Sequence, residues 1–335
     1  MYTDEDLTSA TKVGIFTEDA VSKFRMFIAN ENNSVSVDEE NFRLINGFND
    51  IFVVIACVLM LISVGWIGTA LNTSAGPLAV ALTSWGLTEF FVLRRKMALP
   101  AIVLLASFIG SIAWFAASLF HYAGSNTDVW SFVSAALVSA VAARLHWLRF
   151  KVPITVAAGV AAITGSIVAM FLALFPETRQ WANTLFLIGG VIAFYLAMYW
   201  DAQDTQRLTS KSDVAFWLHL LAAPLIVHPI FSMLGVFEGK NDILIATTVI
   251  FLYIILAIIS IAIDRRALMV SALLYVLFSI TTLLNSFGIV SLGFAITNLA
   301  IGASLLLLSA YWHTSREILI NYIPRSFLTW LPPLR

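Results

Sequence analysis

The feature that most constrains this chain is a succession of long apolar segments that begins at Ile51, separated by short polar connections. A transmembrane helix needs roughly 20 consecutive, mainly apolar residues to cross the hydrocarbon core of a bilayer. The composition agrees, because 60% of the residues are hydrophobic and only 12% are charged, whereas about 25% of a typical soluble domain is charged. The sequence therefore predicts an all-α integral membrane protein.

Ten such segments can be delimited. They are residues 51–71, 77–93, 99–122, 129–148, 153–175, 181–200, 214–237, 242–263, 267–287 and 290–312. If the N-terminus is cytosolic, all Lys and Arg residues except Arg179 and Lys240 fall on the cytosolic side. The positive-inside rule produces this asymmetry. We therefore expect residues 50–313 to form a bundle of about ten transmembrane helices with both chain ends in the cytosol.

The two segments outside the bundle are expected to lie at its cytosolic face. Residues 1–49 are net acidic, Gly14 is typical of a helix end, and Thr17 is typical of a second helix start. We expect a helical hairpin and linker there, which either rests on the membrane or docks a cytosolic protein partner. Residues 314–335 are too short and too charged to span, so an interfacial amphipathic tail is expected.

The sequence lacks the linear motifs of common catalytic and cofactor sites. It has no GxxxxGK[ST] phosphate loop, GxSxG elbow, HExxH or CxxC, its five histidines are dispersed, and Cys57 is its only cysteine. No catalytic residue, metal site, cofactor or nucleic-acid interface is predicted. The lipid bilayer is the expected partner, and nothing in the sequence indicates an oligomeric state.

Two titratable residues lie inside predicted spans, away from their ends. Glu89 lies in the second span and His228 in the seventh, where Pro224 and Pro229 flank the histidine. Ionisable side chains are costly inside a membrane, which makes each one a candidate functional residue. A titratable group next to a helix that is interrupted by proline is typical of proton-coupled transporters. The structural alternative is that Glu89 pairs with a basic residue and His228 donates to a carbonyl freed by a proline.

A second group of polar residues lies at the predicted cytosolic edge of the spans. Its members are Arg144, His146, Asp201, Asp204, Arg207, His219 and Asp264. Asp201, Asp204 and Arg207 are three residues apart and would share one face of a helix. The group is expected either to line a polar vestibule or, as is more common at span ends, to extend to water or form ion pairs.

One short motif resembles an uncharacterised family of bacterial polytopic membrane proteins, which begin with a cytosolic hairpin and continue into a long apolar bundle. The matching residues are Gly14-Ile15-Phe16-Thr17-Glu18-Asp19-Ala20. This resemblance implies a bacterial inner membrane location and supplies no catalytic residue. The ten-span topology is also similar to that of the drug/metabolite transporter superfamily, which is built from two inverted five-helix repeats.

Three functions are therefore carried forward. The first is a secondary transporter or permease of a small solute or ion, proton coupling being one option, with Glu89 and His228 nearest the path. The second is a non-catalytic membrane subunit that scaffolds or regulates a complex through its N-terminal hairpin. The third is a membrane-embedded enzyme that uses the polar group at the cytosolic edge.

Overall fold

The computed structural model describes residues 4–31, 48–121, 128–205, 207, 209–236, 243–286, 291–324 and 330–332. Within these ranges every regular element is a helix. The elements are α1 (Asp4–Lys12), α2 (Glu18–Glu31), α3 (Phe48–Leu71), α4 (Ala75–Thr88), η1 (Glu89–Arg94), α5 (Ala98–His121), α6 (Asp128–Phe150), α7 (Ile154–Leu174), η2 (Pro176–Trp181), α8 (Ala182–Ala202), α9 (Ser210–Met233), α10 (Ile243–Ile263), α11 (Ala267–Ser286), α12 (Ser291–Ala310) and α13 (Trp312–Ile320). The expected all-α character is confirmed for the described residues.

Eight helices in the described ranges are long and apolar enough to cross a membrane. They comprise α3, α4 with η1, α5, α6, α7, η2 with α8, α9 and α10. Helices α11 and α12 follow and are apolar over shorter stretches, residues 267–281 and 301–310. The chain is therefore a multi-pass membrane protein by the length and composition of its helices.

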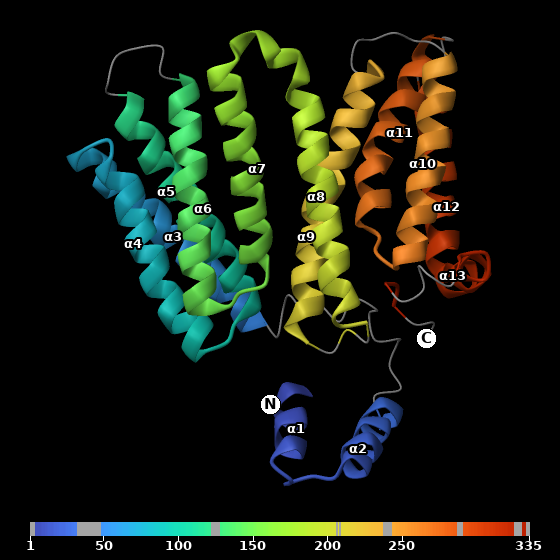
Figure 1. Ribbon diagram of the computed structural model, residues 1–335, viewed down its shortest axis with the longest axis horizontal. Helices are drawn as coiled ribbons and strands as arrows, with labels where there is room; N and C mark the ends of the chain where they lie inside the picture. Colours follow the sequence, from blue (N-terminus) through green and yellow to red (C-terminus); the bar gives the residue numbers. More distant parts are fainter. Residues whose placement is uncertain are drawn as a thin grey trace.

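The apolar helices stand side by side, from α4 at one end of the row to α12 at the other, with α3 behind α4 and α5 and with α11 between α9 and α10 (Figure 1). From α3 to α9 each helix packs against the next, α10 packs against α11, and α9 also contacts α7 and α11. Helix α9 is the most buried candidate span, with 50% of its apolar window inside the protein. Residues on α9 can therefore contact both the helices that precede it in the row, α7 and α8, and α11 on its other side.

Helix α9 begins at Ser210, four residues before the predicted start of the seventh span. Thr209 explains the earlier start, because its backbone is extended and its hydroxyl oxygen accepts a hydrogen bond from the Lys211 backbone N–H at 3.3 Å. The helix then continues through Pro224 and Pro229 to Met233. The two prolines therefore lie inside one continuous helix in this structure.

Glycines allow the backbones of paired helices to approach closely. A Cβ atom added to Gly190 of α8 would lie 2.8 Å from the carbonyl carbon of Leu225 in α9. A Cβ atom added to Gly76 of α4 would lie 2.7 Å from the carbonyl oxygen of Gly65 in α3. Small residues at such contacts replace the hydrophobic driving force that helices lack in lipid. The α8–α9 pair is held together in this way.

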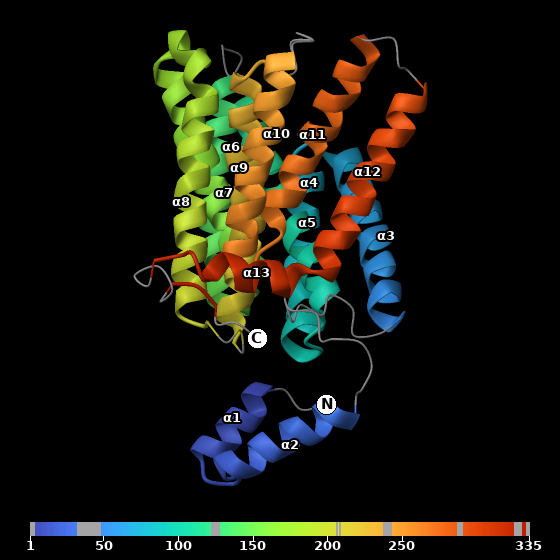
Figure 2. The same ribbon diagram turned by 90° about the vertical axis from the view of Figure 1, so that its right-hand side faces the viewer.

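The two terminal segments lie at the same end of the row (Figure 1). The N-terminal hairpin has the predicted signals, because Gly14 has a φ of 79° after α1 and the Thr17 hydroxyl accepts from the Ala20 N–H at 3.2 Å before α2. Helix α13 runs across the ends of the other helices (Figure 2). It buries Trp312 and Arg316, so the tail is anchored to the helical row.

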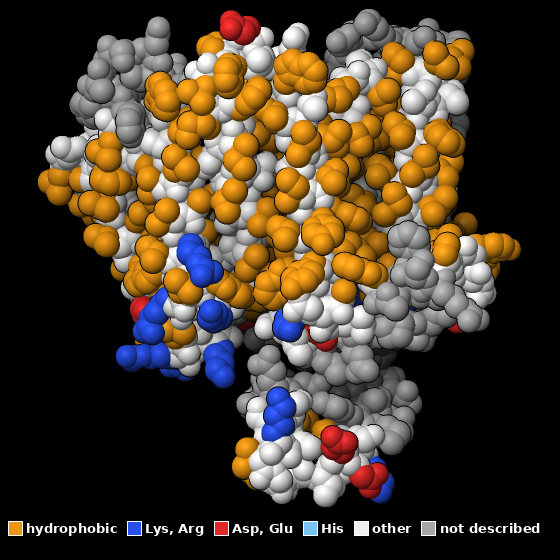
Figure 3. Space-filling view, in the orientation of Figure 1, with side chains coloured by type: hydrophobic (Ala, Val, Ile, Leu, Met, Phe, Trp, Pro, Cys, Tyr) orange, Lys and Arg blue, Asp and Glu red, His pale blue; other side chains and the backbone are white. Residues whose placement is uncertain are grey.

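The visible face of the row is apolar along its middle and carries its basic side chains at one end (Figure 3). Basic side chains gather at the end where the connections η1–α5 and α6–α7 lie. Four of the short connections at this end contain a non-glycine residue in the left-handed conformation, namely Lys96, Lys151, Arg207 and Asp264. This basic end of the row carries the candidate site.

Candidate functional site

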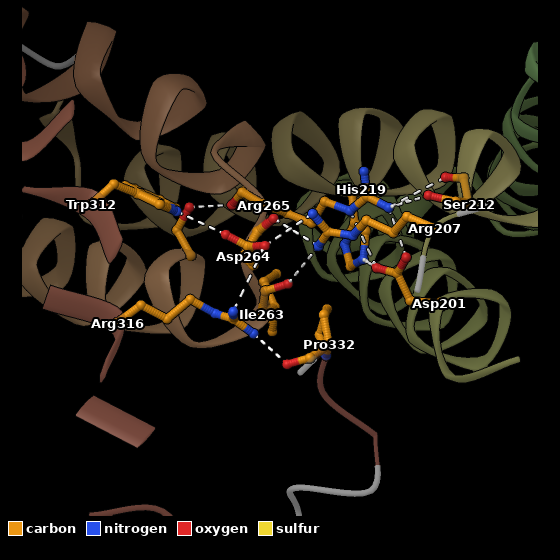
Figure 4. A network of polar contacts seen from close by, with 11 residues as sticks. Asp201, Arg207, Ser212, His219, Ile263, Asp264, Arg265, Trp312, Arg316 and Pro332 are labelled. Atoms are coloured by element: carbon orange, nitrogen blue, oxygen red, sulfur yellow. Dashed lines mark hydrogen bonds and ion pairs between the residues drawn. The ribbon is translucent and has the colours of Figure 1, made fainter. Parts of the chain in front are cut away.

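The connection between α10 and α11 turns two charged side chains toward the protein interior. Asp264 follows α10 with a φ of 58°, which ends the helix, and the Ser260 hydroxyl donates to the backbone carbonyl of Arg265. This local structure directs Arg265 toward α8 and α9. The site is thus assembled from the ends of four helices (Figure 4).

Asp201, at the end of α8, is the acceptor at the centre of the first half of the site. Its carboxylate accepts two hydrogen bonds from Arg265, at 2.7 Å from Nη2 and 3.3 Å from Nε. His219 Nε2 lies 3.1 Å from the same carboxylate. Arg265, Asp201 and His219 have side-chain exposures of only 1, 2 and 1%. This is a fully buried charged cluster.

Ser212 completes that half of the site. Arg265 Nη2 also donates to the Ser212 hydroxyl at 3.2 Å and to its backbone carbonyl at 3.3 Å. Ser212 and His219 both belong to α9, whereas Asp201 belongs to α8. Arg265 therefore ties the α10–α11 connection to both helices of the α8–α9 pair.

Asp264 is the acceptor in the second half of the site. Arg207 Nη1 donates to its carboxylate at 2.9 Å, and Trp312 Nε1 donates at 2.8 Å. Arg316 Nη1 lies 4.0 Å from the same carboxylate, and its Nη2 donates to the carbonyl of Pro332. Trp312 and Arg316 come from α13, so this half ties the C-terminal helix to the basic end of the row.

Among the described residues, the network contains more buried guanidinium groups than carboxylates. Three guanidinium groups, those of Arg207, Arg265 and Arg316, are buried with two carboxylates, those of Asp201 and Asp264. Burial alone would raise the pKa of Asp264, but Arg207, the Trp312 hydrogen bond and Arg316 outweigh it and leave this pKa lowered. Burial lowers the pKa of Arg207, with the nearby Arg265 acting in the same direction.

The geometry suits a structural role better than catalysis. The Ser212 hydroxyl is engaged by Arg265, whereas in a Ser–His–Asp triad it would be hydrogen-bonded to the imidazole. Among the described residues, Nδ1 of the buried His219 has no hydrogen-bond partner. The described residues also contain no group of three or more His, Cys, Asp or Glu placed to hold a metal ion. The network is arranged to hold helices together.

The structure divides the polar group predicted at the cytosolic edge. Asp201, Arg207, His219 and Asp264 come together in the network, as described above. Asp204 instead holds the start of α9, because its Oδ2 accepts from both the N–H and the hydroxyl of Thr209 at 2.8 Å.

The two members of that group on α6 lie outside the network. His146 is buried, with Nδ1 3.1 Å from the Thr155 hydroxyl oxygen of α7. Its ring lies against Trp85, Phe108 and Phe150, with the Phe150 centroid at 4.6 Å. Arg144 is exposed on α6. The polar group is therefore not one vestibule.

Glu89 forms an ion pair with a residue distant in the sequence. Arg149 of α6 donates to both its carboxylate oxygens, from Nε at 2.8 Å and from Nη2 at 2.9 Å. Glu89 is the first residue of the π-helical segment η1. The pair is partly exposed, at 57% for Arg149 and 35% for Glu89. The structure thus gives Glu89 the basic partner that the structural alternative required.

His228 lies on the central helix α9 and contacts α11. Its Nδ1 is 2.8 Å from the Tyr275 hydroxyl oxygen. The Tyr275 ring stacks on Phe231, with 5.0 Å between the ring centroids. The His228 side chain is exposed, although it belongs to an apolar helix. Glu89 and His228 therefore have separate partners on separate helices.

Sequence reasoning missed several members of the network. Arg265 and Arg316 entered the prediction only among the basic residues on the cytosolic side, and Trp312 only as the last residue of the tenth predicted span. The sequence does contain a signal for these residues. The charged run Asp264-Arg265-Arg266 directly follows one apolar segment and precedes the next, so this short connection must stay close to the ends of the helices.

Comparisons with protein families, curated proteins and solved structures were made for the whole chain. The chain matches no family, no curated protein and no solved structure at the level of significance required. The resemblance carried by residues 14–20 and the topological similarity to drug/metabolite transporters therefore stay predictions.

Proposed function

We propose that the chain crosses a bacterial inner membrane ten times, with both ends in the cytosol. Helices α11 and α12 would supply the two spans beyond the eight described above. Support comes from the basic residues, which gather at the end where α1, α2 and α13 also lie. Positive charge close to span ends favours the cytosolic side.

For the function, we propose a secondary transporter of a small solute in which His228 and Tyr275 take part in a proton-linked step. The single observation behind this proposal is the exposed His228 side chain on the most buried span, hydrogen-bonded to Tyr275 of a neighbouring helix at 2.8 Å. Titratable side chains at membrane depth almost always face a water-filled cavity or the protein interior. An exposed imidazole there favours a hydrated path.

The surrounding helix suits such a step. Pro224 and Pro229 lie four residues before and one residue after His228, inside α9. Each proline removes a backbone donor and leaves a carbonyl one turn earlier without its helical partner. Backbone freed in this way is tolerated at membrane depth where other groups or water satisfy it. Imidazole titrates near neutral pH, so its proton can be exchanged under physiological conditions.

Proteoliposomes test this proposal. The full chain is reconstituted with a pH-sensitive dye inside, and the low-molecular-mass fraction of a bacterial extract is added outside. We expect the extract to change the luminal pH of vesicles with the wild-type chain beyond that of protein-free vesicles. His228→Gln should reduce the change to background, whereas His313→Gln, a histidine change on α13, should preserve it. The absence of a response in wild-type vesicles would contradict transport.

One observation favours a second candidate, the non-catalytic membrane subunit. The hairpin presents apolar side chains outside the row of spans, with Val13 77% exposed, Ile15 68% exposed and Phe16 48% exposed at the turn between α1 and α2. Clustered apolar side chains on an otherwise polar segment are typical of protein or membrane contacts. The membrane bundle would then hold the hairpin at the cytosolic surface.

Changes in the hairpin separate this second candidate from the first. Ile15→Ser with Phe16→Ser should release a co-purifying protein if the hairpin is a docking element, and should leave solute-dependent pH changes unaltered. Release of no protein, with the pH response intact, would leave transport as the supported function.

A further inference from the structure

A pocket of about 390 Å³ opens at the basic end of the row, apart from the ion network and from His228. Its lining comes from the η1–α5 connection, the α6–α7 connection and the first turns of α9. The charged residues in this lining are Lys96, Lys151 and Asp213. The pocket therefore lies between the helices α5, α6 and α7 on one side and α9 on the other.

The electrostatics of the pocket favour an anion. The lining contains two lysines and a single carboxylate, and it also includes the first residues of α5 and α7, Ala98 and Ile154. The N-terminus of a long helix carries partial positive charge from its unpaired backbone N–H groups. The Lys151 ammonium lies 5.3 Å from the centre of the Trp147 ring, a cation–π contact beside the pocket.

The backbone at the two lysines points to a requirement for their side chains. Lys96 and Lys151 have φ values of 52° and 55° at the ends of η1 and α6. This left-handed position after a helix is usually occupied by glycine, because other residues are strained there. A binding role for the two ammonium groups would explain why lysine, and not glycine, stands at both positions.

The rest of the wall is apolar. Ile102, Phe150 and Trp217 contribute to it. A hydrophilic anion would gain nothing from these side chains, whereas an anion joined to a hydrocarbon chain would contact both parts of the pocket. Basic pockets between transmembrane helices on the cytosolic side are a known way to bind anionic lipid headgroups.

From these observations we propose that the pocket binds a phosphate-bearing anion between Lys96 and Lys151. Two sources share this chemistry, the headgroup of an anionic phospholipid and a small phosphorylated solute, and the apolar wall favours the phospholipid. The site does not depend on the transport function proposed for His228, because no residue is shared between the two.

Native mass spectrometry of the purified full chain tests the proposal. Phosphatidylglycerol and phosphatidylcholine are titrated separately, and the dissociation constant of the first bound lipid is measured. A lysine beside an anionic lipid contributes about a fivefold gain in affinity, so Lys96→Gln with Lys151→Gln should weaken phosphatidylglycerol binding about twenty-five-fold. Phosphatidylcholine binding should hardly change. Competition by glycerol phosphate at matched concentration would identify the free solute as the source, and its failure would identify the lipid.

A matched control removes the same charge outside the pocket. Arg94→Gln with Arg95→Gln changes two cations next to Lys96, at the end of η1, that are not part of the lining, and should leave the phosphatidylglycerol preference intact. Lys96→Gly with Lys151→Gly relieves the left-handed strain, so this variant should fold at least as stably as the wild type yet lose the preference. Equal losses in the arginine and lysine variants, or no anionic preference in the wild type, would overturn the proposal.

Discussion

Asp201→Asn is the most informative single change in the buried network. Asp201 accepts two hydrogen bonds from Arg265 and contacts His219, all within 3.3 Å. The substitution keeps the size of the side chain, removes its charge and replaces one acceptor oxygen with an NH2 group that cannot accept from Arg265. Arg265 would then keep its guanidinium buried, at 1% exposure, with no carboxylate beside it.

The structure allows the size of the effect to be worked out. Removing one partner of a buried ion pair costs about 3–5 kcal/mol, because the remaining charge stays desolvated. For chains of more than about 150 residues, 1 kcal/mol corresponds to about 2–4 °C in the melting temperature. We therefore expect Asp201→Asn to lower the melting temperature of the detergent-solubilised chain by about 10 °C.

Thermal unfolding followed by tryptophan fluorescence measures this loss. Glu89→Gln is the matched control, because it also turns a carboxylate of an arginine pair into an amide, but in a pair that is partly exposed. Exposed pairs of this kind contribute little to stability, so the control should melt close to the wild type. Adding Arg265→Gln to Asp201→Asn should recover part of the loss, because the orphaned charge is then removed. A single Asp201→Asn variant that melts like the control would refute the reasoning.

Three further predictions use the same thermal assay. Gly190→Ala should cost about 1–3 kcal/mol, because its Cβ would lie 2.8 Å from the Leu225 carbonyl carbon, whereas Gly165→Ala, with no such neighbour, should be neutral or stabilising; equal effects would contradict the close α8–α9 contact. Trp312→Phe removes the 2.8 Å hydrogen bond to Asp264 and should cost about 1–3 kcal/mol, and a neutral result would show that α13 is not anchored there. Asp264 has a lowered pKa in the folded state, so its contribution is present above the unfolded-state value of about 3.9 and is lost as the pH falls through the folded-state value. The stability difference between wild type and Asp264→Asn should therefore shrink on acidification, and a difference that is constant with pH would contradict this linkage.

The apolar periodicity of the sequence predicted the class of fold well, for a physical reason. A span must be long and apolar whatever its neighbours are, so its signal is local. The predicted start of the seventh span, residue 214, was less accurate. Residues 210–213 are polar and were left outside the span, although the Thr209 cap begins the helix at Ser210. Caps depend on backbone conformation, which hydropathy does not contain.

The candidate site was predictable only in part. Asp201 and His219 lie at the adjoining ends of neighbouring spans, so their proximity follows from a short helical hairpin. The pairing of Glu89 with Arg149, 60 residues away, depends on which helices pack together, and a single sequence does not contain that information. Arg265 was overlooked because a basic residue at a span end has two uses, as a topology signal and as a buried partner.

The most direct test of the account is the side of the membrane on which the basic end lies. Gln180 lies in η2 and Gln203 directly follows α8, so these two exposed residues mark opposite ends of this span, and Cys57 is the only native cysteine. In a Cys57→Ala background, Gln180→Cys should react with a membrane-impermeant maleimide in cells whose inner membrane is intact. Gln203→Cys should react only after that membrane is permeabilised. The reverse labelling pattern would contradict the proposed orientation, and with it the cytosolic placement of the network and of the lysine pocket.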